Sequence, residues 1–143
     1  MKEKSVALDE IDSEILRILR IDARISWQAL AAQVQLSPNA VAERVRRLRR
    51  AGVIRGFTID VDRAALGLSL MAVIDIRIDH HQGIEERLQE RDDVVWAARV
   101  TGVPDIKVAV ACAGTEGLDA FIAWLEQAGA RETRTDVVLN MIV

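Results

Sequence analysis

A short stretch near the N-terminus, Ser37 to Arg50, constrains the fold of this chain more than any other part of its sequence. It reads SPNAVAERVRRLRR. Ser37 is a good helix cap, and Pro38 suits the first helical turn, where no backbone N–H group is missed. Apolar residues then recur at spacings of four and three, which predicts one narrow buried face. They are Val41, Val45 and Leu48. Since Gly52 is typical of the end of a helix, we expect a helix that docks by one face and exposes the other.

The exposed face of this predicted helix is strongly basic. Five of its last seven residues are arginines: Arg44, Arg46, Arg47, Arg49 and Arg50. The side opposite the apolar stripe carries Asn39, Glu43, Arg46 and Arg50, flanked by Ala40 and Arg47. Such a face is either a solvated surface or a surface that meets an anionic partner. The neighbouring segments decide between these interpretations.

Two further helices are predicted before this one. Leu8–Ile21 has apolar residues at helical spacing and acidic residues at its N-terminal end. Ser26 caps a short second helix that ends near Val34. The connection to Ser37 is only a few residues long, as in a helix-turn-helix. Any small three-helix bundle would share this pattern, and the basic face of the third helix favours the DNA-binding version.

The next segment, Val53–Val61, consists mostly of good strand formers. A strand at this position is the wing of a winged helix-turn-helix. Asp62–Gly67 reads as a short connector. We therefore expect a winged helix-turn-helix domain at residues 1–53, a linking strand and connector at residues 54–67, and a second domain at residues 68–143.

Residues 68–143 predict the order βαββαβ, the ferredoxin-like (ACT-like) arrangement, so the chain is expected to be of the α+β class. The expected strands are Leu70–Asp79, Val94–Thr101, Ile106–Ala113 and Arg131–Met141, and the expected helices are Gly83–Arg91 and Gly117–Gln127. Two helices cover only one face of such a sheet. The other face is expected to present small apolar residues, which suggests that another subunit covers it. These residues are Val95, Ala97, Ala109 and Ala111.

Composition excludes several classes of protein. Cys112 is the only cysteine, so an internal disulfide is not possible. The apolar runs are too short to span a bilayer and the N-terminus has no apolar signal core, so we expect a cytoplasmic protein. Residues 1–61 carry 11 Lys and Arg against 8 Asp and Glu, whereas residues 62–143 carry 8 against 14. A basic first part in an acidic chain is compatible with nucleic-acid binding, because the local field decides the contact.

These features together resemble the Lrp/AsnC family of bacterial and archaeal transcription regulators, over nearly the whole chain. The matching stretches are Leu8–Asp12, Leu36–Pro38, Arg44–Leu48, Gly52–Phe57 and Gly102–Asp105. The resemblance implies dimers formed through the C-terminal sheet, often a tetramer of dimers, and binding to pseudo-palindromic operators. It also implies an amino-acid effector, held between dimers beside the Gly-x-x-Asp turn.

The predicted DNA contacts all lie on the third helix. They are Ser37, Asn39, Ala40, Glu43, Arg46, Arg47 and Arg50. The arginines can contact phosphates or read guanine, and Ser37 and Asn39 lie at the helix end that enters the major groove. Glu43 either accepts a hydrogen bond from cytosine or orients Arg46 or Arg47 across one turn, and we favour orientation.

The resemblance places the effector between the turn and the last strand. The implied residues are Gly102, Val103, Pro104, Asp105, Asp136, Val137 and Val138. Two positions depart from the family: Pro104 stands where an aromatic residue is common, and Asp136 stands in a stretch where the leucine-responsive member has an aromatic residue. We therefore expect a small or polar amino acid. Asp105 either binds the ammonium group of this ligand or is simply a turn residue.

The sequence thus predicts a DNA-binding transcription regulator that needs no cofactor or metal and is not an enzyme. One alternative is an enzyme similar to the siroheme decarboxylases, which share this architecture and in which His80 or His81 would matter. Another is an amino-acid-binding module that has lost DNA binding. The arginine cluster argues against both. Adjacent strand residues point opposite ways, so a solvated strand end explains the two histidines better than a metal site.

Overall fold

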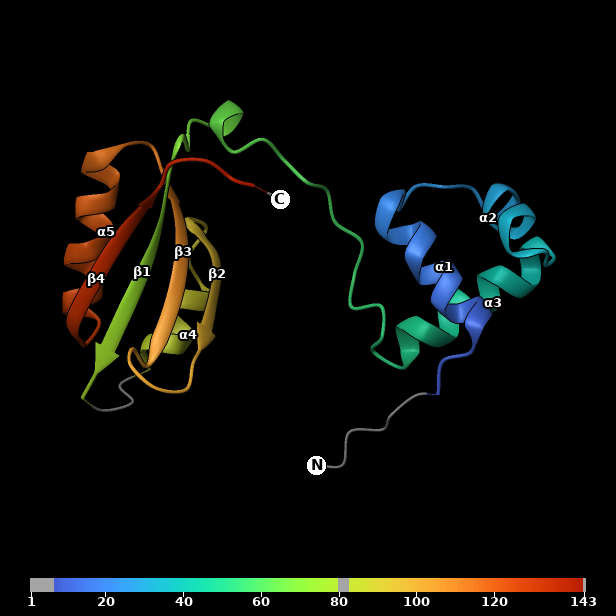
Figure 1. Ribbon diagram of the computed structural model, residues 1–143, viewed down its shortest axis with the longest axis horizontal. Helices are drawn as coiled ribbons and strands as arrows, with labels where there is room; N and C mark the ends of the chain where they lie inside the picture. The colour runs from blue at the N-terminus through green and yellow to red at the C-terminus, as the bar shows by residue number, and fades with distance from the viewer. Residues whose placement is uncertain (1–6, 80–82, 143) are drawn as a thin grey trace. The chain divides into compact units, whose positions relative to one another are not determined.

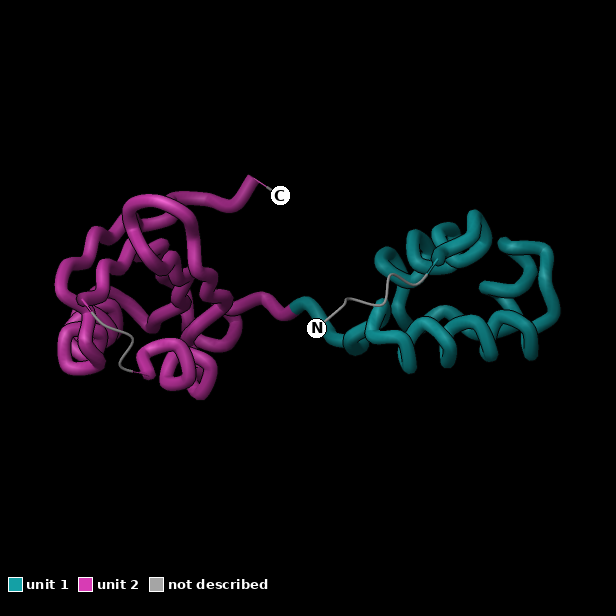
Figure 2. The backbone as a smooth tube through the Cα atoms, turned by 90° about the horizontal axis from the view of Figure 1, so that it is seen from below, with its two compact units in different colours: residues 1–60 teal, residues 61–143 magenta. Residues whose placement is uncertain are grey.

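The computed structural model describes residues 7–79 and 83–142. The chain divides into two compact units, unit 1 at residues 1–60 and unit 2 at residues 61–143 (Figure 2). Each unit has its own hydrophobic core. His80 and His81, which mattered to the enzyme alternative, lie outside the described residues.

Unit 1 is a bundle of three short helices, α1 (Glu10–Ile21), α2 (Trp27–Val34) and α3 (Pro38–Arg50) (Figure 1). Their apolar faces meet in a core that contains Ile15, Ile18, Leu30, Val41 and Val45. Gln35 takes a left-handed conformation with φ of 55°, which allows the tight turn between α2 and α3. The predicted helix-turn-helix is therefore confirmed.

The starts of these helices follow from their caps. The hydroxyls of Ser26 and Ser37 each accept a backbone N–H three residues on, at 3.1 and 3.2 Å, as predicted. The first helix starts at Glu10, so the predicted start at Leu8 was wrong. Asp9 occupies the cap position instead, where its carboxylate accepts the N–H of Asp12 at 2.7 Å.

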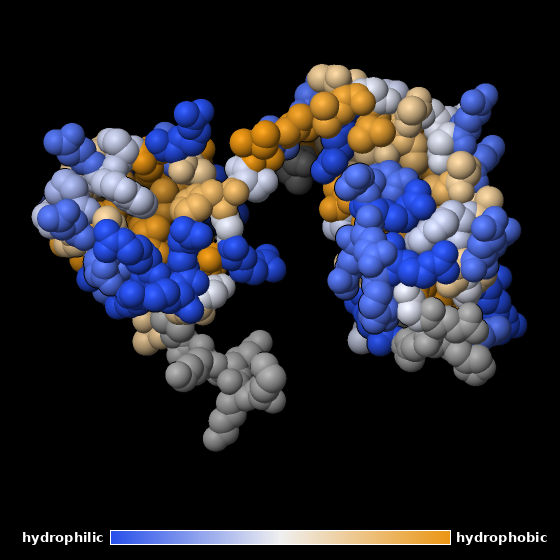
Figure 3. Space-filling view, turned by 180° about the vertical axis from the view of Figure 1, so that it is seen from behind, coloured by the Kyte–Doolittle hydropathy of each residue, from blue (hydrophilic) through white to orange (hydrophobic). Residues whose placement is uncertain are grey.

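The predicted wing strand at Val53–Val61 was also wrong. Residues 55–62 have no regular secondary structure. The side chains of Phe57, Ile59 and Val61 alternate with polar ones, but a strand is stable only when a neighbour takes up its backbone hydrogen bonds. None of the four strands of the described chain pairs with this segment. Figure 3 shows the resulting exposed apolar side chains along the chain between the two units.

Unit 2 has the predicted order βαββαβ after a short 3₁₀ turn, η1 (Ala64–Leu66). Its elements are β1 (Leu70–Ile78), α4 (Ile84–Gln89), β2 (Val94–Arg99), β3 (Ile106–Cys112), α5 (Thr115–Gln127) and β4 (Ala130–Val138). The strands form an antiparallel sheet of order β2-β3-β1-β4, and both helices cover the same face (Figure 1). β4 stops at Val138, which pairs with Met71 near the start of β1, rather than at the predicted Met141.

The core of unit 2 lies between the sheet and the two helices. Alternate strand residues such as Ile74, Ile76 and Val108 meet Phe121 and Leu125 of α5 there. The side chains in between point to the opposite face, here called the open face. No described helix of unit 2 covers it.

A β-bulge in β2 changes which of its residues reach the open face. Val94 pairs with Val110, but the next pair is Trp96 with Ala109, so Val95 has no partner of its own. Ala97 then pairs with the core residue Val108. Because paired residues share a face, the prediction that Ala97 lies on the open face was wrong, and Trp96 takes that place.

Ala109 and Ala111 do lie on the open face, as predicted. They are 1% and 0% exposed although no described helix of unit 2 covers them. Their paired neighbours are the larger side chains of Val73, Met71 and Trp96, which flank them on this face.

In the part of the chain that the structure describes, no helix is long and apolar enough to cross a membrane.

Candidate nucleic-acid interface and ligand pocket

The orientation of α3 follows from its buried stripe. Val41, Val45 and Leu48 are at most 2% exposed and pack into unit 1, so the opposite side of the helix faces outward. This outward side carries Asn39, Glu43, Arg46 and Arg50, all exposed, and is here called the outer face. The Ser37 hydroxyl is engaged as the helix cap, and Ala40 is half-buried at the flank of this face.

Glu43 bridges the two arginines of the outer face. Its two carboxylate oxygens accept hydrogen bonds from Arg46 Nη1 at 2.6 Å and from Arg50 Nη2 at 2.8 Å. The hydrogen bonds from Arg50 and Arg46 hold the pKa of the Glu43 carboxyl below its ordinary value. The expected pairing of Glu43 with Arg46 is therefore confirmed, and Arg50 joins it.

Two other arginines of α3 turn toward α1 instead. Arg44 Nη1 donates to Asp12 Oδ1 at 2.8 Å and to Asp9 Oδ2 at 2.6 Å, and Arg47 donates to Asp12 Oδ2. Asp12 is 0% exposed, so its charge needs such partners. Arg44, together with the Asp12 backbone N–H, lowers the pKa of the Asp9 carboxyl. Arg47, predicted as a DNA contact, thus helps to hold α3 on α1.

The fifth arginine, Arg49, lies over the Phe57 ring at 5.8 Å from its centroid. A guanidinium in this position is attracted by the aromatic face. Arg46 and Arg50 are therefore the arginines that remain on the outer face. The sequence did not reveal this division, because Asp12 has an ordinary explanation as an acidic residue in a first helical turn.

The turn between β2 and β3 holds the other predicted site. Gly102 has φ of 104°, a conformation that favours glycine, and a side chain there would meet no other atom within 4 Å. Asp105 ties the turn to the end of β1: its Oδ2 accepts the N–H of Ile78 at 2.9 Å, and its own N–H donates to the Ile76 carbonyl at 3.0 Å. These contacts support the interpretation of Asp105 as a turn residue.

A cavity of about 150 Å³ lies beside this turn on the open face, and is here called the charged pocket. Its lining residues are Asp75, Arg77, Val103, Pro104, Glu132 and Arg134. Arg77 Nη1 contacts Glu132 Oε2 at 3.3 Å, and Asp75 pairs with Lys107. Carboxylates and guanidinium groups therefore meet around one small space, which suits a ligand that carries both signs of charge.

The strand opposite the turn contributes other residues than the resemblance implied. Asp136 and Val138 pair with Val73 and Met71, which lie nearer the start of β1 than the pocket residues Asp75 and Arg77. Val137 pairs with the core residue Ala72 and so lies on the helix-covered face. Glu132 and Arg134 line the pocket instead. The two-residue alternation of β4 was a signal for this face, but its register against β1 was not readable from the sequence.

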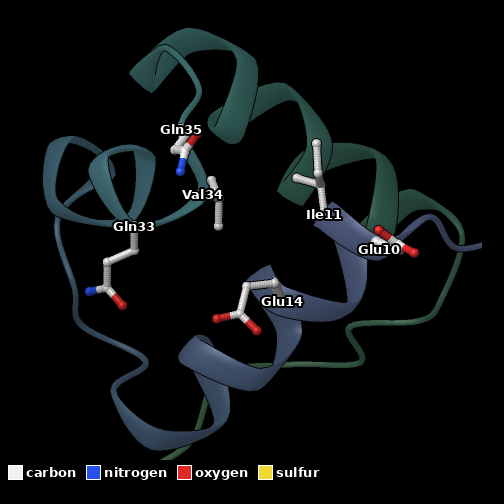
Figure 4. Close-up of a pocket in the computed structure, with 6 residues that line it drawn as sticks. All are labelled: Glu10, Ile11, Glu14, Gln33, Val34 and Gln35. Atoms are coloured by element: carbon white, nitrogen blue, oxygen red, sulfur yellow. The ribbon is translucent and has the colours of Figure 1, made fainter.

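Another cavity, of about 390 Å³, lies on unit 1 between the start of α1 and the end of α2 (Figure 4). It is lined by Glu10, Ile11, Glu14, Gln33, Val34 and Gln35. Its lining contains no residue of α3 and no basic residue. It is therefore unsuited to contact with a phosphate backbone.

Comparisons with known proteins agree with this arrangement. An AsnC-type helix-turn-helix domain matches residues 8–49, and a Lrp/AsnC ligand binding domain matches residues 71–143. The HTH-type transcriptional regulator AldR of Mycolicibacterium smegmatis is 38% identical over 120 residues, which span 80% of this chain and 70% of AldR. The structure of B. subtilis LrpC matches with a TM-score of 0.89 and 27% identity, over 96% of this chain and 99% of LrpC. E. coli AsnC matches with a TM-score of 0.83 and 28% identity, over 96% of both chains.

The buried carboxylate predicts a stability effect. Asp12→Ala should lower the free energy of unfolding by about 1–3 kcal/mol, because Arg47 and the Asp9 N–H would lose their acceptor and Arg44 would keep only Asp9. Urea unfolding of the full chain, followed by circular dichroism, measures this. Glu14→Ala is the control, since it removes an exposed carboxylate that pairs with Arg17 on the same helix. An equal decrease in both variants would show that the burial of Asp12 has no special role.

Proposed function

This chain belongs to the Lrp/AsnC family of transcription regulators, and we propose that it recognises a specific operator through the outer face of α3. The proposal rests on the different orientations of the five arginines of α3. Three of them hold the fold together or stack on Phe57, whereas Arg46 and Arg50 point outward with Asn39 and Glu43. A recognition helix needs such an outward set of hydrogen-bonding groups on a rigid support.

The residues of α3 take different roles in this proposal. Asn39 and Ala40 lie in its first turn, the end that reaches base edges in helix-turn-helix proteins, while Ser37 keeps that turn capped. Arg46 and Arg50 lie farther along and contact phosphates or a guanine edge. Arg47 is half exposed and supports the helix from its flank.

The relatives give no support to the enzyme alternative, since they are named transcriptional regulators. Membership of a DNA-binding family likewise weighs against a module that has lost DNA binding. A transcription regulator must be in the compartment that contains its target DNA, so the proposal includes a cytoplasmic location.

We further propose that the chain forms a homodimer through the open face of unit 2, and that dimers assemble further into a tetramer of dimers. The open face carries an apolar area around Ala109 and Ala111, with Met71, Val73 and a 46% exposed Trp96 beside them. Burying such an area is the main driving force of association. A dimer also presents two copies of α3 to half-sites about one helical turn of DNA apart.

The charged pocket is proposed as the place where a small or polar amino acid binds. Its volume of about 150 Å³ suits a small ligand. Glu132 or Asp75 would accept from the ammonium group, and Arg77 or Arg134 would donate to the carboxylate. The pocket opens on the same face as the apolar area, so a second subunit there would lie close to the ligand. Binding would then change assembly and DNA affinity together.

Removal of the outward arginines tests the DNA-binding proposal. Arg46→Ala combined with Arg50→Ala should weaken binding to a duplex selected by the wild-type chain from a random-sequence pool by about 100-fold, because neither guanidinium group is left to bind the DNA. The log–log salt dependence should also flatten by about 0.9 for each phosphate contact removed. Fluorescence anisotropy measures both quantities. Arg17→Ala with Arg20→Ala is the matched control on α1. Wild-type affinity in the α3 variant would refute the proposal.

A charge on the open face tests the dimer. Ala109→Arg should convert the dimer to a monomer in light scattering, because an unpaired guanidinium would be buried in the interface. Ala123→Arg, on the exposed side of α5, adds the same charge away from that face and should leave the dimer intact. A wild-type monomer at micromolar concentration would contradict the proposal.

Calorimetry with the common amino acids tests the effector. Arg134→Ala should weaken the binding of the preferred amino acid by about tenfold or more, because it removes the donor of a charge-assisted hydrogen bond. Arg131→Ala is the control, since it removes an arginine of the same strand that pairs with Asp79 outside the charged pocket. The amino-acid proposal is wrong if none of these compounds binds the wild-type chain. If both variants bind the amino acid as the wild type does, the assignment of the charged pocket as its binding site is wrong.

A further inference from the structure

The outer face of α3 contains one acidic side chain, Glu43, at its centre. Glu43 is the only acidic residue in the sequence of α3. It follows Asn39 by one turn and precedes Arg46 and Arg50 by about one and two turns. A carboxylate in this position does not add to the attraction of the helix for phosphates.

The contacts of Glu43 occupy both outward arginines at once. One carboxylate oxygen accepts from Arg46 at 2.6 Å and the other from Arg50 at 2.8 Å. The cluster of Glu43, Arg46 and Arg50 therefore carries one net positive charge where the arginines alone would carry two. One N–H group of each arginine points at Glu43, so only the remaining donors of each guanidinium group are free for phosphate while these pairs persist.

This cluster is exposed to water, so opening it is easy. The side chains of Glu43, Arg46 and Arg50 are 56%, 63% and 70% exposed. Ion pairs in such surroundings are weak, because water and salt screen them. A DNA surface that offers a good alternative to each member can therefore replace the pairs.

The carboxylate and the guanidinium groups bind different chemical groups on DNA. An ionised carboxylate only accepts hydrogen bonds and is repelled by phosphate, whereas the amino group of cytosine donates to it in the major groove. Arg46 and Arg50 find acceptors on any duplex. A duplex without a suitably placed cytosine thus leaves Glu43 unpaired among phosphates when the arginines move away.

We propose that Glu43 is a specificity-determining residue that holds Arg46 and Arg50 back from DNA of arbitrary sequence. The two arginines are released fully only where a cytosine amino group binds the Glu43 carboxylate. The residue therefore lowers affinity for non-specific DNA more than affinity for the operator. This inference rests on the proposed function of α3, and it adds the rule by which that face discriminates.

The test compares Glu43→Gln with wild type on two probes. The first is the duplex that the wild-type chain selects from a random-sequence pool, and the second is the same duplex with its bases scrambled. Glu43→Gln should bind the scrambled duplex more tightly, with a salt dependence steeper by about 0.9 for each new phosphate contact. The ratio of affinities for the two duplexes should fall by about tenfold, the size of one specific base contact. Repeated selection with the variant should show one cytosine preference fewer in each half-site.

Glu14→Gln is the matched control. It removes the same charge from an exposed carboxylate that binds Arg17 at 2.7 Å on α1, so it should keep the wild-type ratio and salt dependence. Equal shifts in both variants would reduce the effect of Glu43 to net charge and overturn the inference, as would wild-type behaviour of Glu43→Gln. The double variant Arg46→Ala with Arg50→Ala distinguishes failure of this inference from failure of the proposed function. If it no longer binds the selected duplex while Glu43→Gln behaves as wild type, only this inference fails, whereas if it binds normally, the proposed function fails with it.

Discussion

The arrangement of unit 1 depends on the buried carboxylate of Asp12. A charge without access to water is tolerated only where donors surround it, and Arg44, Arg47 and the Asp9 N–H supply them. These contacts fix α3 against α1 and remove two arginines from its outward charge. One side chain near the N-terminus thus helps to hold α3 on α1 and determines which of its arginines remain on the outer face.

The charged side chains on the outer face of α3 are Glu43, Arg46 and Arg50, and they pair with one another. The same is true on the open face of unit 2, where Arg77 binds Glu132 and Lys107 binds Asp75 beside the charged pocket. Exposed pairs of this kind add little to stability, and they exchange readily for a ligand that offers the same hydrogen bonds. Both proposed binding surfaces are therefore built from groups that are satisfied before the ligand arrives, which favours selectivity over raw affinity.

Local patterns in the sequence predicted the helices, their serine caps and the order βαββαβ, because spacing and capping act over a few residues. Three features depend on partners distant in the chain and were missed. The segment around Phe57 and Ile59 has strand-forming residues, but no described strand pairs with it. The partners of Arg47 were not visible without the packing of α1. The lining of the charged pocket by Glu132 and Arg134 follows from the register of β4 against β1, which a single sequence does not specify.

The bulge at Val95 determines how β2 can lose a residue during evolution. In a regular antiparallel ladder, the deletion or insertion of one residue exchanges the two faces of everything beyond it. Here Val95 is the residue without a partner, and the pairs from Trp96 onward do not depend on it. Deleting it would leave a straight strand with Val94 and Trp96 on their present faces. The edge strand β2 is thus a position where evolution can remove a residue without turning Trp96 away from the surface where a second subunit would pack.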